Sequence, residues 1–149
     1  MTLFDDPAVL PARTLLQPFA GLVELGLKDI ETVATRTSYR GPLVICAGHR
    51  VDVEALRKIR RALVPRRVSP EAFDEATARA GVAVAVATIA TCRRLERHDR
   101  SRAFWWSASE PRWAWLLEDL CRLRPFKVRG MPGFFPLSRS SVEAARILR

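Results

Sequence analysis

The sequence lacks any apolar run long enough to cross a membrane. Its longest apolar stretch, Ala80–Ala90, has 11 residues, about half of the ~20 that a transmembrane helix requires. The N-terminus carries Asp5 and Asp6 before the first Arg or Lys, so it also lacks the cationic start of a secretory signal. We therefore expect no contact with a membrane and a cytoplasmic location.

Cysteine and histidine are scarce. The three cysteines, Cys46, Cys92 and Cys121, are widely spaced without a CxxC pair, and only two histidines accompany them. A disulfide framework or a structural zinc site needs more numerous and more regularly spaced groups, so we expect no metal and no cofactor. His49 and His98 are interpreted as surface or structural residues.

Lysine is almost absent. Of the 25 Lys and Arg residues only Lys28, Lys58 and Lys127 are lysines, which leaves 22 arginines, and the net charge is +9. Guanidinium groups bind phosphate through two points and stack on bases, so this composition favours a nucleic-acid partner over a small neutral substrate. An arginine-rich proteome would produce the same count, and this alternative stays open.

Common signatures of enzyme chemistry are missing as well. The sequence contains no GxxxxGK(S/T), GxGxxG, HExxH or GxSxG pattern. These patterns mark nucleotide hydrolysis, dinucleotide binding, zinc proteolysis and α/β-hydrolase chemistry. Their absence removes support from most familiar enzyme classes.

The chain has the size of one domain. Its 149 residues, 48% hydrophobic and 28% charged, suit one globular unit that buries a real core. We predict a single domain over residues 1–149, with its core at about 15–137 and a short C-terminal helix at 138–149.

Positive charge is concentrated in three segments. The first 31 residues have a net charge of −3, whereas Arg50–Arg67 carries +5, and Arg93–Arg102 and Arg112–Arg129 carry +3 each. If the fold brings these segments to one face, their field attracts a polyanion and holds it by counterion release. If they point in different directions, they are solvated surface.

Turn residues and hydrophobic spacing predict the secondary structure. Helices are expected where a capping residue or a proline precedes apolar residues at helical spacing: Pro18–Leu25, Asp52–Leu63, a segment that starts at Ser69, and Ser140–Arg149. Strands are expected where β-branched and apolar residues run together or alternate: Ile30–Thr37, Leu43–Ala47, Val82–Thr91, Trp113–Glu118 and Leu123–Arg129. This order has no regular βαβ rhythm, so it predicts an α+β fold with a mostly antiparallel or barrel-like sheet.

Short segments follow one another in a particular order through most of the chain. Gln17–Phe19 opens a helix, Gly26–Glu31 reads GLKDIE, and Tyr39–Leu43 reads YRGPL. The aromatic-led segment Trp113–Glu118 and the turn Gly130–Phe134 come later. Together, over about residues 15–137, these segments resemble the ASCH domain of the PUA-like superfamily, whose pattern includes a GxKxxE turn followed by an RGPL strand.

The resemblance implies a fold and two kinds of activity. It implies a PUA-like small β-barrel, mostly antiparallel, with packed helices and a cleft beside the GxKxxE turn. Members of the family are associated with RNA or nucleic-acid binding, and some similar small proteins hydrolyse an acyl amide on a modified cytidine or cleave RNA. In those hydrolases the motif lysine lies in the active site with a hydroxyl or carboxylate partner. By position, Lys28 and Glu31 correspond to such a pair.

Two positions depart from the family's pattern. The family commonly has an arginine two residues after the motif glutamate, where this chain has Val33, with Arg36 as a substitute three residues later. It often has a histidine where this chain has Cys46. Both changes are expected to remove polar groups from the cleft, which weighs against catalysis, whereas the positive charge weighs for binding.

Lys28 and Glu31 are the candidate catalytic residues if the protein is an enzyme. A lysine and a carboxylate three residues apart across a glycine-led turn could anchor a phosphate and a base edge, or could transfer a proton. A surface ion pair worth about 0–1 kcal/mol is the structural alternative.

The candidate nucleic-acid contacts are basic and aromatic. Phe104, Trp105 and Trp106 follow a basic segment and could stack unpaired bases, although packing as core is an equal alternative. Arg57, Arg60 and Arg61 share one side of a helix and could contact phosphates, or could merely solvate that helix. The full predicted set is Lys28, Arg36, Arg40, Arg57, Arg60, Arg61, Arg102, Trp105 and Trp106.

These observations favour a binding module whose partner is RNA or single-stranded nucleic acid. The second hypothesis is a small hydrolase that acts on an acylated or modified cytidine or on RNA, with Lys28 and Glu31 in its site. The third is an adaptor whose arginines contact an acidic protein.

Overall fold

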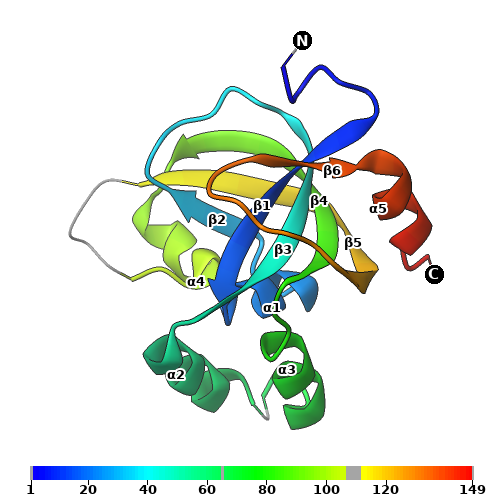
Figure 1. Cartoon of the computed structure of the whole chain (residues 1–149). Helices are drawn as coiled ribbons and strands as arrows, with labels where there is room; N and C mark the ends of the chain where they lie inside the picture. Colours follow the sequence, from blue (N-terminus) through cyan, green and yellow to red (C-terminus); the bar gives the residue numbers. More distant parts are fainter. Residues whose placement is uncertain (1, 65, 107–111, 149) are drawn as a thin grey trace.

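The computed structural model describes residues 2–64, 66–106 and 112–148, which form a twisted sheet with helices at its ends and edges (Figure 1). The strands are β1 (Val9–Gln17), β2 (Ile30–Val33), β3 (Gly41–Val51), β4 (Val82–Arg94), β5 (Trp113–Lys127) and β6 (Phe135–Ser138). The helices are α1 (Phe19–Glu24), α2 (Val53–Leu63), α3 (Pro70–Thr77), α4 (Arg100–Ala103) and α5 (Arg139–Ala145), and a short 3-10 turn, η1 (Arg97–Asp99), precedes α4.

The strands form one sheet in the order β2-β5-β4-β3-β1-β6. β1 and β3 run parallel, and the other neighbouring pairs run antiparallel. The predicted α+β class and the mostly antiparallel sheet are therefore confirmed. Among the described strands, β2 and β6 each have a neighbour on one side only, so the sheet is not closed and the predicted barrel is not confirmed.

Two strands, β1 and β6, are missing from the sequence-based prediction. They pair with each other through Pro11 opposite Pro136, and β1 also pairs with β3 through Ala12 opposite Val44. Proline donates no hydrogen bond to a strand ladder and is unusual inside a sheet. Because of these two prolines, neither strand was predicted from the sequence.

The two short strands expected near residues 113–118 and 123–129 are one long strand, β5. The charged residues Glu118 and Asp119 interrupt the apolar pattern between the two expected segments. For this reason the sequence predicted two strands and not one. Asp119 has a φ of 52°, and the β4–β5 register shifts between Val86 and Thr88, near this point. A local irregularity of this kind bends a strand without ending it.

The helix starts follow the capping signals of the sequence. The Asp52 side chain accepts a hydrogen bond from the Ala55 N–H at 3.0 Å and caps α2. The Ser69 hydroxyl accepts one from the Ala72 N–H at 3.1 Å and caps α3. The four predicted helices are confirmed, although the last one ends at Ala145 and not at the end of the chain.

The sheet separates two apolar clusters, and the helices add a third. One face buries Leu15, Ile45, Val84, Ile89 and Trp115. The other face buries Leu10, Val44, Val86, Phe135 and, from α5, Val142. Leu22 of α1 packs with Ile59 and Leu63 of α2 and with Phe73 of α3, so α2 and α3 lie together beyond α1 at one end of the sheet (Figure 1).

A buried glutamine fastens the α2–α3 segment to the sheet. The Gln17 Nε2 donates to the carbonyls of Ala76 and Arg79, both at 3.0 Å, and its Oε1 accepts from the Gly21 N–H at 2.9 Å. The segment leaves the sheet after β3 and returns at Gly81, whose N–H donates to the Ala47 carbonyl at 2.8 Å. At the other end, the Asp52 N–H donates to the Gln17 carbonyl at 2.8 Å, so both ends of the segment are tied to β1 or β3.

Two further features are absent from the described residues. No helix there has the length and apolar character needed to span a bilayer. No group of three or more His, Cys, Asp or Glu side chains in the same residues is arranged to hold a metal ion.

Candidate functional site

A pocket of about 190 Å³ lies where β1, β2 and the end of α4 meet. The candidate residues Lys28, Glu31 and Trp105 all line it. The other polar lining residues are Arg13, Thr14, Thr32 and Arg112. This pocket is called the Glu31 pocket below.

Lys28 is buried, with 3% of its surface exposed. Its Nζ donates to the carbonyls of Ile30 and Ala103, both at 2.5 Å, and lies 3.4 Å from Glu31 Oε1. An ammonium group has three hydrogens to donate, and each of them has an acceptor here. The lysine therefore connects the start of β2 to the end of α4, and it is not an exposed surface pair with Glu31.

Burial lowers the pKa of Lys28, because a low-dielectric surrounding disfavours the charged ammonium. The nearby Glu31 carboxylate opposes this shift by attraction and by hydrogen bonding. A lysine with a lowered pKa is better suited to proton transfer than an exposed lysine. The three acceptors, in contrast, favour the protonated form of the group.

Glu31 supplies a negative charge to the same pocket. Its side chain is 13% exposed, and its Oε1 accepts a hydrogen bond from the Thr32 N–H at 2.9 Å. A carboxylate can accept about four hydrogen bonds, so the group retains capacity for a ligand that donates one.

Three polar atoms in the wall of the pocket have no hydrogen-bond partner among the described residues. They are Thr14 Oγ1, Trp105 Nε1 and Arg112 Nε, and all three are buried. A buried polar group without a partner costs about 1–3 kcal/mol, and proteins normally satisfy such groups with protein, water or ligand atoms. Their clustering in one pocket indicates a site for a polar ligand.

Aromatic rings orient the two arginines of the pocket. The Arg112 guanidinium lies 4.6 Å from the centre of the Trp105 ring, and its Nη2 donates to the Thr32 carbonyl at 3.0 Å. The Arg13 guanidinium lies 5.0 Å from the centre of the Trp115 ring. Stacking of this kind fixes the guanidinium plane and leaves N–H groups at its edge for an acceptor.

Trp105 also borders a second, more open groove, called the Trp106 groove. It has a volume of about 430 Å³ and is lined by residues that include Phe19, Phe104, Trp106 and Lys58. Trp106 is 60% exposed, whereas Phe104 is buried. The two tryptophans of the predicted binding set are therefore adjacent to the Glu31 pocket, one in its wall and one beside it.

Two of the predicted phosphate-binding arginines already form ion pairs. Arg60 binds Asp74 through two hydrogen bonds of 2.9 and 3.0 Å. Arg102 binds Asp29 through two hydrogen bonds of 2.9 Å. Each pair places a carboxylate beside the guanidinium, so both arginines attract a phosphate less strongly than isolated ones.

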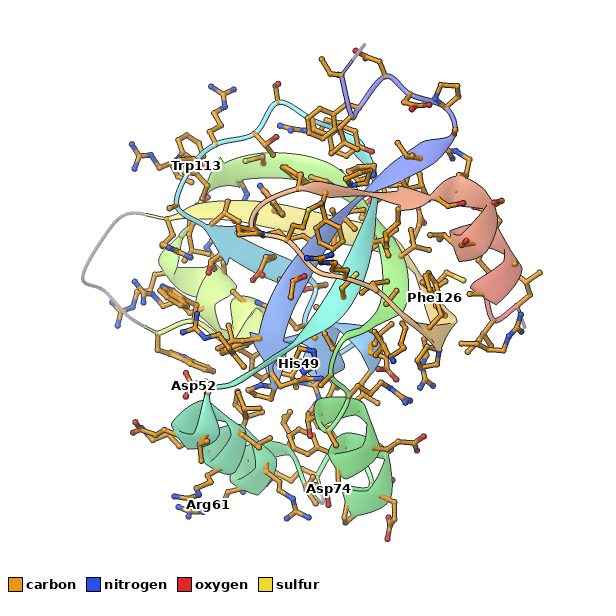
Figure 2. All side chains as sticks on the ribbon, in the orientation of Figure 1. His49, Asp52, Arg61, Asp74, Trp113 and Phe126 are labelled. Carbon is orange, nitrogen blue, oxygen red and sulfur yellow. The ribbon has the colours of Figure 1, made fainter. Side chains whose placement is uncertain are left out.

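Arg57 and Arg61 are exposed on α2. Figure 2 shows Arg61 and Asp74 on the α2–α3 pair, at the opposite end of the molecule from Trp113. None of the α2 arginines lines the Glu31 pocket. The phosphate-binding ridge of Arg57, Arg60 and Arg61 stays a prediction, and it is separate from the pocket.

Arg36 and Arg40 lie on the connection between β2 and β3. The Arg36 guanidinium lies 5.7 Å from the centre of the Trp113 ring. The Arg40 Nη1 donates to the carbonyls of Thr37 and Tyr39, both at 2.9 Å. Neither arginine lines the Glu31 pocket, so the structure does not bring them together with Lys28.

The two departures from the family pattern fall on core positions. Val33 is 3% exposed and Cys46 is fully buried, and burial raises the pKa of the Cys46 thiol to about 12. Neither residue lines the Glu31 pocket. The expectation that these changes remove polar groups from the cleft is therefore wrong for this pocket.

Three lining residues, Arg13, Thr14 and Arg112, were not predicted from the sequence. Arg13 and Thr14 lie on β1, which was not predicted, and Arg112 immediately precedes the aromatic segment that begins β5. The sequence signal for the β1 site residues was the polar pair Arg13 and Thr14 between the apolar residues Ala12 and Leu15. That signal has meaning only when the segment is recognised as a strand.

Comparison with known proteins gives matches in structure alone. No protein-family model matches the chain, and no curated protein matches its sequence. The crystal structure of ASCH from Zymomonas mobilis superposes on this structure with a TM-score of 0.57 at 13% sequence identity, covering 89% of this chain and 90% of that chain. The chain has an ASCH-like fold.

Two crystal structures of variants of the Zymomonas mobilis ASCH protein agree with this result. In one a tyrosine is replaced by phenylalanine and in the other a serine by alanine, and both have a TM-score of 0.54 at 14% identity. They cover 90% of this chain, and 94% and 92% of theirs. The resemblance drawn from the sequence segments is thereby confirmed at the level of the fold.

Proposed function

We propose that this ASCH-like chain acts as a single module that binds single-stranded nucleic acid, RNA in particular, and takes one base into the Glu31 pocket. The observation that carries the proposal is the cluster of unpartnered polar atoms on Thr14, Trp105 and Arg112. The indole and guanidinium nitrogens only donate hydrogen bonds, whereas Glu31 in the same pocket only accepts them when ionised. A matching ligand carries acceptors and a donor along one edge.

A nucleobase has such an edge. Its ring nitrogen or carbonyl group would accept from Trp105 and Arg112, and an exocyclic amino group would donate to Glu31. Proteins that recognise single-stranded RNA hold unstacked bases by edge contacts of this type and by aromatic stacking. Cytosine carries the amino group and uracil does not, so the pocket is proposed to favour cytosine over uracil.

The charge of the chain supports a polyanionic ligand. The net charge is +9, and within the described ranges Arg13 and Arg112 of the pocket have no carboxylate partner. The exposed ring of Trp106 beside the pocket would stack the next base, a contact worth about 1–3 kcal/mol in other single-strand binders. The ASCH-like fold is consistent with this proposal.

Fluorescence anisotropy with short oligo-C and oligo-U RNAs, and with the corresponding DNAs, tests the proposal. We expect affinity to fall steeply as salt rises, since each phosphate contact on a single strand contributes about −0.7 to the slope of log K against log salt. We also expect oligo-C to bind more tightly than oligo-U. No binding in dilute salt, or an affinity independent of salt, would refute the nucleic-acid proposal.

A pair of tryptophan variants tests the pocket itself. Trp105→Phe keeps an aromatic ring but removes the buried Nε1 donor, so it should weaken oligo-C binding by about tenfold, the value of one hydrogen bond of about 1.4 kcal/mol. Trp106→Phe makes the same chemical change at an exposed position and should have little effect. An equal loss for both variants would show that the base does not bind in the Glu31 pocket.

The α2 arginines are tested separately. Replacing Arg57, Arg60 and Arg61 with alanine should weaken every oligonucleotide by a similar factor and reduce the salt slope, because phosphate contacts carry no sequence information. A loss confined to one sequence would contradict this role.

A second candidate function is hydrolysis of an acylated or modified cytidine or of RNA. One observation favours it: Lys28, Glu31 and the Thr14 hydroxyl line the same pocket. Glu31→Gln preserves the shape of the side chain and removes its charge. Turnover by the wild type that disappears in this variant would support a hydrolase. A wild-type protein that binds RNA and leaves these substrates unchanged would support a binding module.

A further inference from the structure

We infer that a second pocket, next to the Glu31 pocket, binds a phosphate group of the strand whose base the Glu31 pocket holds. This inference rests on the proposed function. The second pocket is called the His49 pocket. It is formed by β1, by the end of β3 and by the loop that connects β5 to β6, and it has a volume of about 430 Å³.

The basic side chains of the His49 pocket are Arg13, His49 and Arg50, and no Asp or Glu is among the described residues that line it. Figure 2 shows His49 near the end of β3, where the chain approaches Asp52 and α2. His49 and Arg50 are both exposed. A site that combines guanidinium and imidazole donors without a carboxylate favours an anion over a cation or a neutral group.

Glycines line the pocket and bring its walls close together. A Cβ atom at Gly130 would lie 2.8 Å from Thr14 Oγ1, and one at Gly81 would lie 2.9 Å from the His49 Nε2. Gly81 and Gly133 also have positive φ values, 67° and 69°, which side chains rarely adopt. A side chain at Gly130 or Gly81 would therefore displace the Thr14 hydroxyl or the His49 ring, which are two of the polar groups of the pocket.

The two pockets are neighbours, because Arg13 and Thr14 line both of them. The unpartnered Thr14 hydroxyl lies at this boundary and can donate to an anionic oxygen. Arg13 is held against the Trp115 ring, which leaves its edge for a phosphate. A base in the Glu31 pocket would thus have a phosphate of its own backbone within reach of the His49 pocket.

Figure 1 shows the β5–β6 connection, residues 128–134, crossing in front of β1 and β3. The lining of the His49 pocket includes Val128, Met131 and Pro132 from this connection as well as residues of both strands. The phosphate would therefore sit beneath a loop, between the loop and the sheet. This arrangement differs from the open α2 surface, where a phosphate would contact exposed side chains alone.

The experiment uses inorganic phosphate as the first probe. In a titration of the full chain followed by backbone amide NMR, we expect the largest shifts at residues 48–50 and 130–133, with sulfate competing and chloride at equal ionic strength having little effect. Arg50→Gln should weaken phosphate binding at least fivefold, and His49→Gln should weaken it less. Arg67→Gln, which removes an equal charge from an exposed site between α2 and α3, should leave binding unchanged.

The second probe distinguishes a backbone phosphate from free phosphate. Oligo-C RNA carrying one uncharged methylphosphonate linkage is compared with the unmodified strand, the linkage being moved along the strand. One position should weaken binding to the wild type more than the others, and Arg50→Gln should abolish that difference. A uniform loss at all positions, or the same pattern in Arg50→Gln, would overturn the inference.

The outcomes separate the inference from the proposed function. If phosphate shifts residues 48–50 and 130–133 but no oligonucleotide binds, the pocket is a site for free phosphate and both proposals about nucleic acid are wrong. If RNA binds in the Glu31 pocket but phosphate shifts residues elsewhere, or none, the proposed function stands and the inference about the His49 pocket is wrong.

Discussion

Replacing Lys28 with methionine is expected to destabilise the fold before it affects any chemistry. The substitution leaves the carbonyls of Ile30 and Ala103 without their donor and Glu31 without its counter-ion. An unsatisfied buried carbonyl costs about 1–3 kcal/mol, and removing one partner of a buried ion pair costs about 3–5 kcal/mol. Because these effects overlap and Glu31 is partly exposed, we expect a total loss of about 3–5 kcal/mol.

The loss is measurable by urea unfolding, followed by circular dichroism and tryptophan fluorescence. A small domain has a total stability of about 5–15 kcal/mol, so the midpoint of unfolding should fall sharply while the slope of the transition stays constant. The double variant Lys28→Met/Glu31→Gln no longer contains an unpaired carboxylate. It should be about 1–2 kcal/mol more stable than Lys28→Met alone.

A loss below about 1 kcal/mol for Lys28→Met would refute this reasoning, since it would match an exposed ion pair. A double variant no more stable than the single one would show that Glu31 does not depend on Lys28. The expected outcome affects the choice of functional variants. A Lys28 variant that lacks activity cannot separate chemistry from folding, whereas Glu31→Gln keeps the lysine and its two carbonyl acceptors in place.

Two further predictions concern acid stability and thiol reactivity. Hydrogen bonds from Arg93 lower the pKa of buried Asp99 to about 2. The charged carboxylate therefore stabilises the fold above the usual carboxyl pKa near 4. This stabilisation, about 2 kcal/mol in all, is lost as pH falls from about 4 to about 2. Asp99→Asn should remove this part of the acid dependence in unfolding measured across that range, and an unchanged dependence would contradict the assignment. Cys46 and Cys92 are buried and Cys121 is partly exposed. A thiol reagent should therefore label Cys121 in the native protein and all three cysteines in denaturant. Rapid labelling of Cys46 in the native protein would contradict its burial.

The helices were the most predictable part of the fold. Asp52 and Ser69 cap their helices through local hydrogen bonds, and such signals depend only on neighbours in sequence. The alternation of valine and alanine in β4 was similarly clear, because this strand lies between β3 and β5 in the sheet. The single domain over residues 1–149 stays a prediction.

The candidate site was predictable only in part. Lys28 and Glu31 were found through the GxKxxE turn, and Trp105 through its aromatic neighbours. Arg112 was not found, because its role depends on contacts with Trp105 and Thr32 that connect distant parts of the chain. Sequence spacing describes neighbours along the chain, whereas a pocket wall is assembled by strand pairing and loop crossing.

The ion pairs of Arg60 and Arg102 show a second limit of predicting binding residues from the sequence. A count of basic residues treats every arginine as available to a phosphate. The partners Asp74 and Asp29 lie 14 and 73 residues away along the chain, so a count over short segments does not detect the neutralisation. Net charge therefore does not identify which arginines already have a carboxylate partner.

The position of the α2–α3 segment has a consequence for how such a chain can diversify. β3 pairs with β4 as far as Ala47 opposite Val82 and continues beside β1 to Val51 opposite Gln17. Residues 52–81 therefore form an excursion from the sheet, and both of its ends are hydrogen-bonded to strands, Asp52 N–H to the Gln17 carbonyl and Gly81 N–H to the Ala47 carbonyl. An excursion of this geometry can change in length or sequence without changing a strand register, provided that its packing on α1 and its hydrogen bonds to Gln17 are kept. His49, Arg50 and Gly81 lie at its base, on the rim of the His49 pocket. Exchanging the helices would thus be a route to new ligand preferences on an unchanged sheet, and it offers protein engineers a graft point for loops taken from other binding proteins.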